Sequence, residues 1–325
     1  MIYRIIIALL ILFSDPLSIT AQGLLLDGVI SKDQEVLERT RADQIPKIAS
    51  LKAYAPHVMM QQNSTCVAYS VAAARTMLFA RNYDITSKDT ITALYYSPHW
   101  VYYSNKDSYD FSCSSGLNLD KTLKHLLSNG IPRMMFVEYP EYYPFTVDVL
   151  CGSYPPTKVE DIENAKQNGV DNVYKLENIE DVKIALSRGM PVVFGMAVNE
   201  HFEDLLDQDV WLPTESTKEL QQYGHAMVIV GYNDYKYGGS VEVLNSWGTE
   251  WGNNGYVWIR YADLLDYISK FVFAIDKNKE SKFGSSVQSN ELHSPSTLSK
   301  IDKSETVNIF SRVSDLTKEL KARNN

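Results

Sequence analysis

The sequence predicts an α+β fold, with a helical first half and a second half built mainly of strands. Apolar residues follow a helical spacing early in the chain, and we expect helices over about 65–80, 97–104 and 118–128. After about residue 170 the chain changes to short β-branched or aromatic runs such as PVVFGMAV and AMVIVGY, which predict an antiparallel sheet or open barrel, interrupted by one helix over about 179–188. Two halves of different type favour two lobes, and a cleft between lobes is a common site for chemistry.

The first 21 residues have the layout of a secretory signal peptide. Arg4 precedes the apolar run IIIALLILF, and a stretch of small residues then ends at Ala21. The apolar run is too short to span a membrane. We therefore expect an exported protein, secreted or periplasmic, with no membrane span in the mature chain.

Residues 22–50 form a short N-terminal segment before the globular part of the chain. Ser31 and Gln34 have the spacing of a capping box, which predicts a short helix through about Arg41. Pro46 would then end this helical stretch.

The globular domain is expected over 51–278, and a different composition follows it. Residues 279–303 are polar and rich in Ser, as in a linker. Residues 304–325 form a C-terminal helix or tail, in which an apolar stripe consists of Val307, Phe310, Val313, Leu316 and Leu320. This helix either docks on its own domain or frays, or it binds a partner.

The bulk composition excludes some classes of function. Hydrophobic residues make up 45% of the 325 residues, enough for a substantial core, while the formal net charge is -9. The charge and the lack of a basic run argue against a protein that binds nucleic acid or anionic membranes. The chain shows no metal-ligand spacing, so we expect neither a metal nor a cofactor.

The three cysteines raise the question of a reactive thiol. They are Cys66, Cys113 and Cys151, and an odd number in an exported chain leaves one thiol over. Cys66 is either a small buried hydrophobe or a nucleophile. Ser64 or Thr65 would cap the helix that starts here, and the N–H groups of its first turn would stabilise a thiolate.

A nucleophilic thiol needs a base, and the base needs a group that orients it. His225 opens the apolar strand of GHAMVIVGY, and Asn245 ends another strand in VLNSWG. Side chains at the ends of neighbouring strands can meet at one edge of a cleft, where a neutral amide would fix the imidazole tautomer. Trp247 would cover this hydrogen bond, and the Cys66 N–H would face a developing oxyanion.

Three segments together resemble the papain-like cysteine peptidases. They are QQNSTCVAYS, GHAMVIVGY and NSWGTEWGNNGYVWI, in the order Cys, His, Asn, and the resemblance covers roughly residues 51–275. SLKAYAP and SRGMPVV are similar to the exported bacterial branch. The resemblance implies a papain-like fold with a helical left lobe, an antiparallel β-barrel-like right lobe and an active site in the cleft between them. It also implies an endopeptidase that hydrolyses peptide or protein substrates through an acyl-enzyme on Cys66.

The resemblance assigns further residues to the site. The glutamine that completes the family's oxyanion hole stands six residues before the cysteine, where this chain has Met60. A loop shorter by one residue would give that role to Gln61, with Gln62 as the second candidate. In CSSG, the resemblance implies that Gly116, next to Ser115, offers its backbone to an extended peptide.

Other positions depart from the family pattern. Asn63 stands where most members have a cysteine, so Cys113 lacks that partner. We expect Cys113 to pair with Cys151 in a disulfide within the left lobe, which leaves Cys66 free. The 22–50 segment is too short for the family's helical pro-domain. The main alternative function is a catalytically weak or silent homologue that binds peptides or a partner, and a thiol acyltransferase is a further one.

Overall fold

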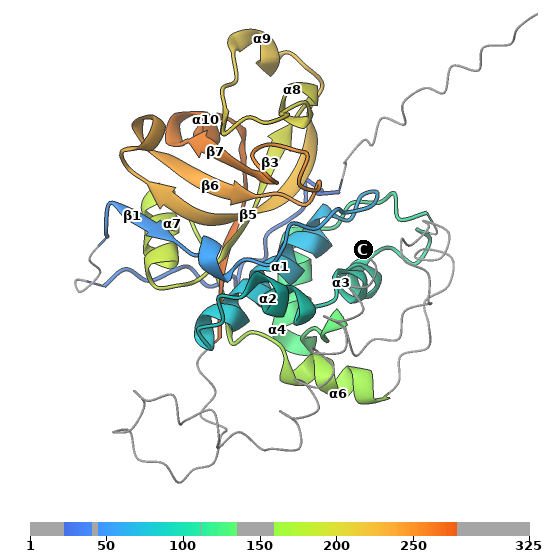
Figure 1. The fold of residues 1–325 in the computed structure, drawn as a ribbon. Coiled ribbons are helices and arrows are strands. Elements are labelled where there is room, and N and C mark those ends of the chain that lie inside the picture. Colours follow the sequence, from blue (N-terminus) through green and yellow to red (C-terminus); the bar gives the residue numbers. More distant parts are fainter. Residues whose placement is uncertain (1–22, 41–44, 111, 135–158, 278–325) are drawn as a thin grey trace, which may run out of the picture.

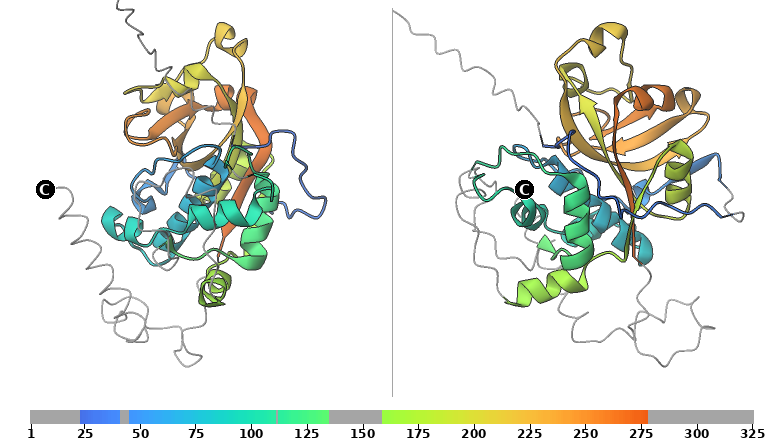
Figure 2. Two further views of the ribbon diagram at one scale, coloured as in Figure 1. Left: turned by 90° about the vertical axis from the view of Figure 1, so that its right-hand side faces the viewer. Right: turned by 180° about the vertical axis from the view of Figure 1, so that it is seen from behind.

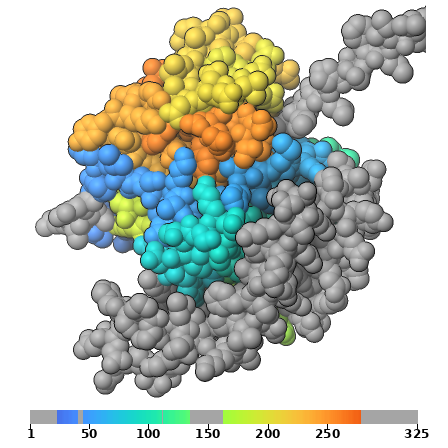
Figure 3. All heavy atoms as spheres, viewed as in Figure 1, coloured from blue at the N-terminus to red at the C-terminus, as the bar shows by residue number. Residues whose placement is uncertain are grey.

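The computed structural model describes residues 23–40, 45–110, 112–134 and 159–277 of the chain, which form two lobes (Figure 1). The predicted signal peptide, linker and C-terminal helix lie outside the described residues. In the space-filling view, the right lobe, in orange and yellow, sits directly on the blue and teal left lobe (Figure 3).

The left lobe is helical, as predicted. Its helices are α1 (Cys66–Asn82), α2 (Lys88–Ala93), α3 (Pro98–Asn105), α4 (Leu119–Asn129) and α6 (Val159–Gln167). Polar caps set two of the helix starts, because Ser97 accepts from the N–H of Trp100 and Asn118 accepts from that of Lys121. The two short helices α2 and α6 were not expected from the sequence.

The right lobe is one mixed sheet in which antiparallel pairs dominate. Its strands are β1 (Ile48–Ser50), β2 (Asn172–Lys175), β3 (Val192–Val198), β4 (Val210–Trp211), β5 (Tyr223–Asn233), β6 (Ser240–Leu244), β7 (Tyr256–Arg260) and β8 (Ile268–Asp276). The order is β2-β8-β3-β5-β6-β7-β4, with β1 on β5, and only β4 and β7 are parallel among the described pairs. Among the described residues β2 and β4 do not pair with each other, so the sheet is not closed, which agrees with the predicted antiparallel sheet or open barrel.

Short helices lie between the strands along the chain. They are the 3-10 helices η1 (Lys52–Tyr54) and η3 (Lys236–Gly238) and the α-helices α7 (Ile179–Ser187), α8 (Glu200–Glu203), α9 (Glu215–Lys218) and α10 (Tyr261–Tyr267). The predicted helix over 179–188 is α7, which starts where Asn178 accepts from the N–H of Asp181.

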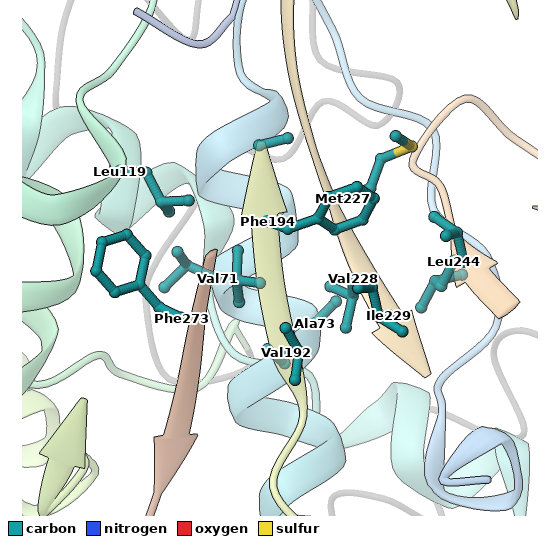
Figure 4. Packing of buried hydrophobic residues seen from close by; sticks show 14 of the residues in the cluster. Val71, Ala73, Leu119, Val192, Phe194, Met227, Val228, Ile229, Leu244 and Phe273 are labelled. Carbon is teal, nitrogen blue, oxygen red and sulfur yellow. The ribbon is translucent and has the colours of Figure 1, made fainter. Parts of the chain in front are cut away.

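The core lies between α1 and the sheet. Most of α1 is buried on every side, and its small residues, such as Ala73, let the helix approach β5 and β3 closely. Figure 4 shows Val71 and Ala73 of α1 beside Val192 and Val228 of the sheet. This packing fixes the N-terminus of α1, which carries Cys66, against the end of β5, which carries His225.

Residues 23–39, here called the strap, run along the boundary between the lobes, as the view from behind shows (Figure 2). The helix predicted from Ser31 does not form. Ser31 and Gln34 make only a turn, and the following backbone pairs with β2, where Lys175 donates to the Glu35 carbonyl and accepts from Leu37. Pairing with a strand edge satisfies the backbone groups that a helix would have satisfied internally.

Side chains hold the strap to both lobes. Ser31 donates through its N–H and its hydroxyl to the buried carboxylate of Asp120 on α4. Arg39 donates to Asp181 at 2.7 Å and to Glu180 at 2.6 Å, both on α7. The strap therefore spans both lobes.

Candidate active site

Cys66 is the first residue of α1 and is fully buried. Its Sγ accepts a hydrogen bond from the N–H of Ala226 at 3.4 Å, which places the thiol beside the residue that follows His225. Thr65 occupies the N-cap position but makes no capping bond, because its hydroxyl donates to the Gln62 carbonyl instead. The helix start alone, without a side-chain cap, presents Cys66 to the cleft.

His225 and Asn245 meet at the end of the sheet where β5 begins and β6 ends. His225 Nε2 lies 2.8 Å from Asn245 Oδ1, and the N–H of Ser246 also donates to that oxygen at 2.8 Å. Since the acceptor at Asn245 is an oxygen, Nε2 must carry the proton in the neutral imidazole. Nδ1 is therefore the basic nitrogen, and it is buried without a hydrogen-bond partner among the described residues.

Trp247 covers the imidazole. Its ring stacks on His225 with 4.3 Å between ring centroids and an interplanar angle of 26°. Phe202 and Trp251 pack against Trp247 in turn, so the indole is held in place from behind. This aromatic cover shields the His225–Asn245 hydrogen bond from water.

Burial keeps both reactive groups neutral in this arrangement. It raises the pKa of Cys66 to about 12, although the N–H groups of Ala226, Val67, Cys66 and Gly23 lower it. Burial also lowers the pKa of His225 to about 4, while the bond to Asn245 raises it. A closed site therefore holds a thiol and an imidazole, and solvent must enter before a thiolate–imidazolium pair can form.

The three positions considered for the second oxyanion donor, Met60, Gln61 and Gln62, have different surroundings. Gln61 is buried and tied to the residue after Asn245: its N–H donates to the Ser246 carbonyl at 2.7 Å, and its Oε1 accepts from the Ser246 hydroxyl at 2.7 Å. Its Nε2 donates to the Asn63 carbonyl at 3.0 Å. Met60 is 66% exposed, and Gln62 makes no such link to Ser246.

The segment around Gly116 forms one edge of the site, but its neighbour makes the observed pairing. Leu117 donates to the Gly23 carbonyl at 2.9 Å and accepts from the Leu25 N–H at 3.1 Å. Ser115 has an exposed side chain, and its backbone is bonded inward. The roles predicted for Ser115 and Gly116 stay predictions.

The strap passes directly over the thiol, which the sequence did not predict. A β-carbon built on Gly23 would come within 2.4 Å of Cys66 Sγ. The next residue, Leu24, is buried, and its N–H donates to the Gly224 carbonyl at 3.2 Å. A Leu24 methyl lies where a β-carbon on Gly195 would stand, at 2.2 Å. A non-helical segment therefore covers the thiol.

Sequence reasoning missed the backbone partners of the thiol and of the strap, Ala226 and Gly224. A signal was present, because Gly224 directly precedes His225, and a glycine there lets another backbone approach. Nothing in the composition of residues 23–26 indicated that they would occupy the cleft.

The other sequence-based expectations have limited outcomes. The predicted disulfide involves Cys151, which lies outside the described residues, so that pairing stays a prediction, while Cys66 is a free thiol. Over the described ranges, no helix is both long and apolar enough to cross a bilayer. Within the same ranges, His, Cys, Asp and Glu side chains form no group that would hold a metal ion.

The fold agrees with comparisons to known proteins. The family model for papain family cysteine proteases matches residues 56–269, and the chain belongs to that family. An uncharacterized peptidase C1-like protein of Acanthamoeba polyphaga mimivirus is 38% identical over 96 residues, 28% of this chain and 29% of that protein. Cathepsin K of Gallus gallus is 30% identical over 121 residues, 37% of this chain and 34% of that protein. The chain thus spans about a third of the length of these curated relatives.

Solved structures share the fold. Xylellain, a cysteine protease from Xylella fastidiosa, superposes with a TM-score of 0.63 at 21% identity, over 79% of this chain and 96% of that one. Digestive procathepsin L2 from the larval midgut of Tenebrio molitor gives a TM-score of 0.56 at 18% identity, over 80% of this chain and 79% of that one. The predicted papain-like two-lobe fold is confirmed, and the sheet of its right lobe is not closed.

Proposed function

We propose that this protein is an exported cysteine endopeptidase that hydrolyses peptide bonds with Cys66, His225 and Asn245. The observation that carries the proposal is the hydrogen bond from His225 Nε2 to Asn245 Oδ1 at 2.8 Å. This bond leaves Nδ1 of the same ring as the basic nitrogen, and the next residue, Ala226, donates its N–H to Cys66 Sγ. Export is supported by the apolar run after Arg4 alone.

The mechanism follows from these positions. In an open, solvated cleft His225 Nδ1 takes the thiol proton, and the Cys66 thiolate attacks the substrate carbonyl carbon. The Cys66 N–H and the Gln61 amide donate to the resulting oxyanion. The imidazolium then protonates the leaving amine, and an acyl-enzyme remains on sulfur. Water, deprotonated by His225, attacks this thioester, the acyl group leaves as a carboxylic acid, and His225 returns the proton to the sulfur.

In the proposed cycle the strap makes the enzyme latent. Gly23 lies where a substrate carbonyl must approach the sulfur, and Leu24 fills the space next to Gly195 and Gly224. Substrate and strap therefore compete for one cleft.

The alternative, a weak or silent homologue, has its own support. One of the two Gln61 Nε2 hydrogens is engaged by the Asn63 carbonyl, and burial raises the pKa of Cys66 to about 12. If these features persist when the strap leaves, the cleft binds peptides without cutting them.

A digestion experiment tests the proposal. The Gly23→Ala variant, in which a methyl group cannot fit against the sulfur, is incubated with labelled casein, and wild type and Gly23→Ala/Cys66→Ser serve as controls. We expect cleavage by Gly23→Ala that disappears in the double variant. If an epoxide peptide inhibitor labels Cys66 in Gly23→Ala but no casein or library peptide is cut, the silent-homologue alternative replaces the peptidase.

A further inference from the structure

The loop of residues 112–117 links the cleft edge to the turn before the nucleophile. At one end Leu117 pairs with the strap through both its N–H and its carbonyl. At the other end the Cys113 carbonyl accepts from the Ser64 N–H at 3.3 Å, and the Ser112 carbonyl accepts from the Asn63 side chain at 3.3 Å. A shift of this loop would therefore move the peptide-binding edge and disturb the turn that leads into α1.

A buried carboxylate lies beneath this loop. Asp110 is only 6% exposed, and its two oxygens accept from the N–H of Ser114 at 3.1 Å and from the N–H of Ser115 at 3.3 Å. The Tyr102 hydroxyl lies 2.7 Å from Asp110 Oδ2 and 2.6 Å from the Ser115 carbonyl, and it can donate its single proton to either. Lys106 Nζ donates to the Asp110 carbonyl at 2.5 Å.

The charge of Asp110 suits this position. Burial raises the pKa of Asp110, but the hydrogen bonds from Tyr102, Ser114, Ser115 and Ser112 lower it, and the net direction is down. The carboxylate is therefore ionised at neutral pH, and charge-assisted bonds of this kind are stronger than neutral ones.

We propose that Asp110, supported by Tyr102, is a positioning residue that fixes the cleft edge at Leu117 to which an extended peptide pairs. Asp110 touches neither the thiol nor the strap, and it acts through the backbone of Ser114 and Ser115. The inference rests on the proposed function where the peptide is a substrate, but it applies equally to the strap.

A kinetic experiment tests the substrate side. In the Gly23→Ala background, Asp110→Asn replaces one acceptor oxygen by an NH₂ group that opposes the serine N–H groups. We expect KM for peptide substrates to rise roughly tenfold, as for loss of a hydrogen bond to a charged group, with kcat changed less than about twofold. The rate of Cys66 labelling by iodoacetamide should not change. Asp107 is exposed and lies three residues before Asp110, so Asp107→Asn is the matched control, for which KM should stay unchanged.

An exchange experiment on the full-length chain needs no catalysis. In the closed form, amide hydrogen exchange at Leu25 and Leu117 reports the strap pairing directly. We expect Asp110→Asn to speed exchange at these two amides by on the order of tenfold. The amides of β5 should exchange in Asp110→Asn as in wild type, and Leu25 and Leu117 should exchange in Asp107→Asn as in wild type. If Asp110→Asn exchanges faster throughout, Tyr102→Phe replaces it and should show a smaller local increase.

The outcomes separate this inference from the proposed function. The inference is overturned if exchange at Leu25 and Leu117 is unchanged in folded Asp110→Asn, or in Tyr102→Phe where that variant replaces it. A fall in kcat with KM unchanged would overturn it as well. A chain that cuts no peptide in any background refutes the peptidase proposal only, because faster local exchange would still establish Asp110 as the support of the edge.

Discussion

The Cα of Gly23 packs against the sulfur of Cys66 so closely that a β-carbon there would come within 2.4 Å of Sγ. Real β-carbon contacts are essentially never this short, so a larger residue at position 23 requires the strap or the thiol to shift. The absence of a side chain at position 23 is therefore a condition of the closed arrangement.

The first prediction concerns this contact. Gly23→Ala should displace the first residues of the strap and raise the rate of Cys66 alkylation by iodoacetamide by at least about tenfold, because the closed thiol is fully buried. Mass spectrometry of the labelled chain gives the rate. Val29→Ala, a change at a strap residue that is 78% exposed, is the matched control and should label as slowly as wild type. Equal labelling of all three proteins would show that the strap does not guard the thiol.

The second prediction concerns pH. In the closed form the pKa of Cys66 is about 12 and that of His225 is about 4, so both groups are neutral between these values. Labelling of wild type should therefore rise steadily with pH across the neutral range, as the thiolate fraction grows. In Gly23→Ala solvent enters, the thiolate–imidazolium pair becomes accessible, and labelling should already be fast near pH 6. Parallel profiles for the two proteins would contradict this account.

The third prediction concerns the oxyanion hole. Gln61→Ala in the Gly23→Ala background should lower kcat by roughly 10²–10³ with a smaller change in KM, because one oxyanion donor is lost. Cys66 alkylation should survive, since it develops no oxyanion. Met60→Ala is the matched control and should be kinetically neutral, as its side chain is 66% exposed. A loss seen with Gln62→Ala but not with Gln61→Ala would transfer the role by one residue.

The fourth prediction concerns acid stability. Burial lowers the pKa of His99 to about 4, well below the 6.5 of an exposed histidine. Between these values the unfolded chain binds more protons, so the stability due to neutral His99 is full above pH 6.5 and is lost as the pH falls towards 4. The loss amounts to about 3 kcal/mol at most. In urea titrations at pH 7 and pH 4.5, His99→Gln should lose less stability than wild type, and an equal loss would count against a buried neutral imidazole.

The sequence predicted the parts of the fold in which local and long-range preferences agree. The helix expected over 118–128 is α4, which Asn118 caps and which Gly130 ends with a positive φ of 69°. The segment after Ser31 failed because its capping box is a local preference, whereas its backbone bonds are made to Lys175, far along the chain. Pairing with a distant strand edge leaves no local pattern to detect.

The candidate site divides in the same way. The sequence could predict that His225 and Asn245 lie close together, because the ends of neighbouring strands meet at one edge of a sheet. The sequence left the choice between Gln61 and Gln62 open, because the bonds of Gln61 are made to Ser246, far along the chain. The role of Gln61 in the oxyanion hole stays a prediction. Asp110 carries no motif, and its significance appears only from the loop above it.

The chain that follows residue 40 joins the strap covalently to β1, so the strap stays near its binding site whatever the concentration of the protein. A tethered ligand occupies its cleft at an effective concentration in the millimolar range, however dilute the protein becomes. The closed state would therefore persist at any dilution. A single nick between the strap and β1 would turn the same segment into a free peptide with ordinary bimolecular binding, and dilution alone would then empty the cleft.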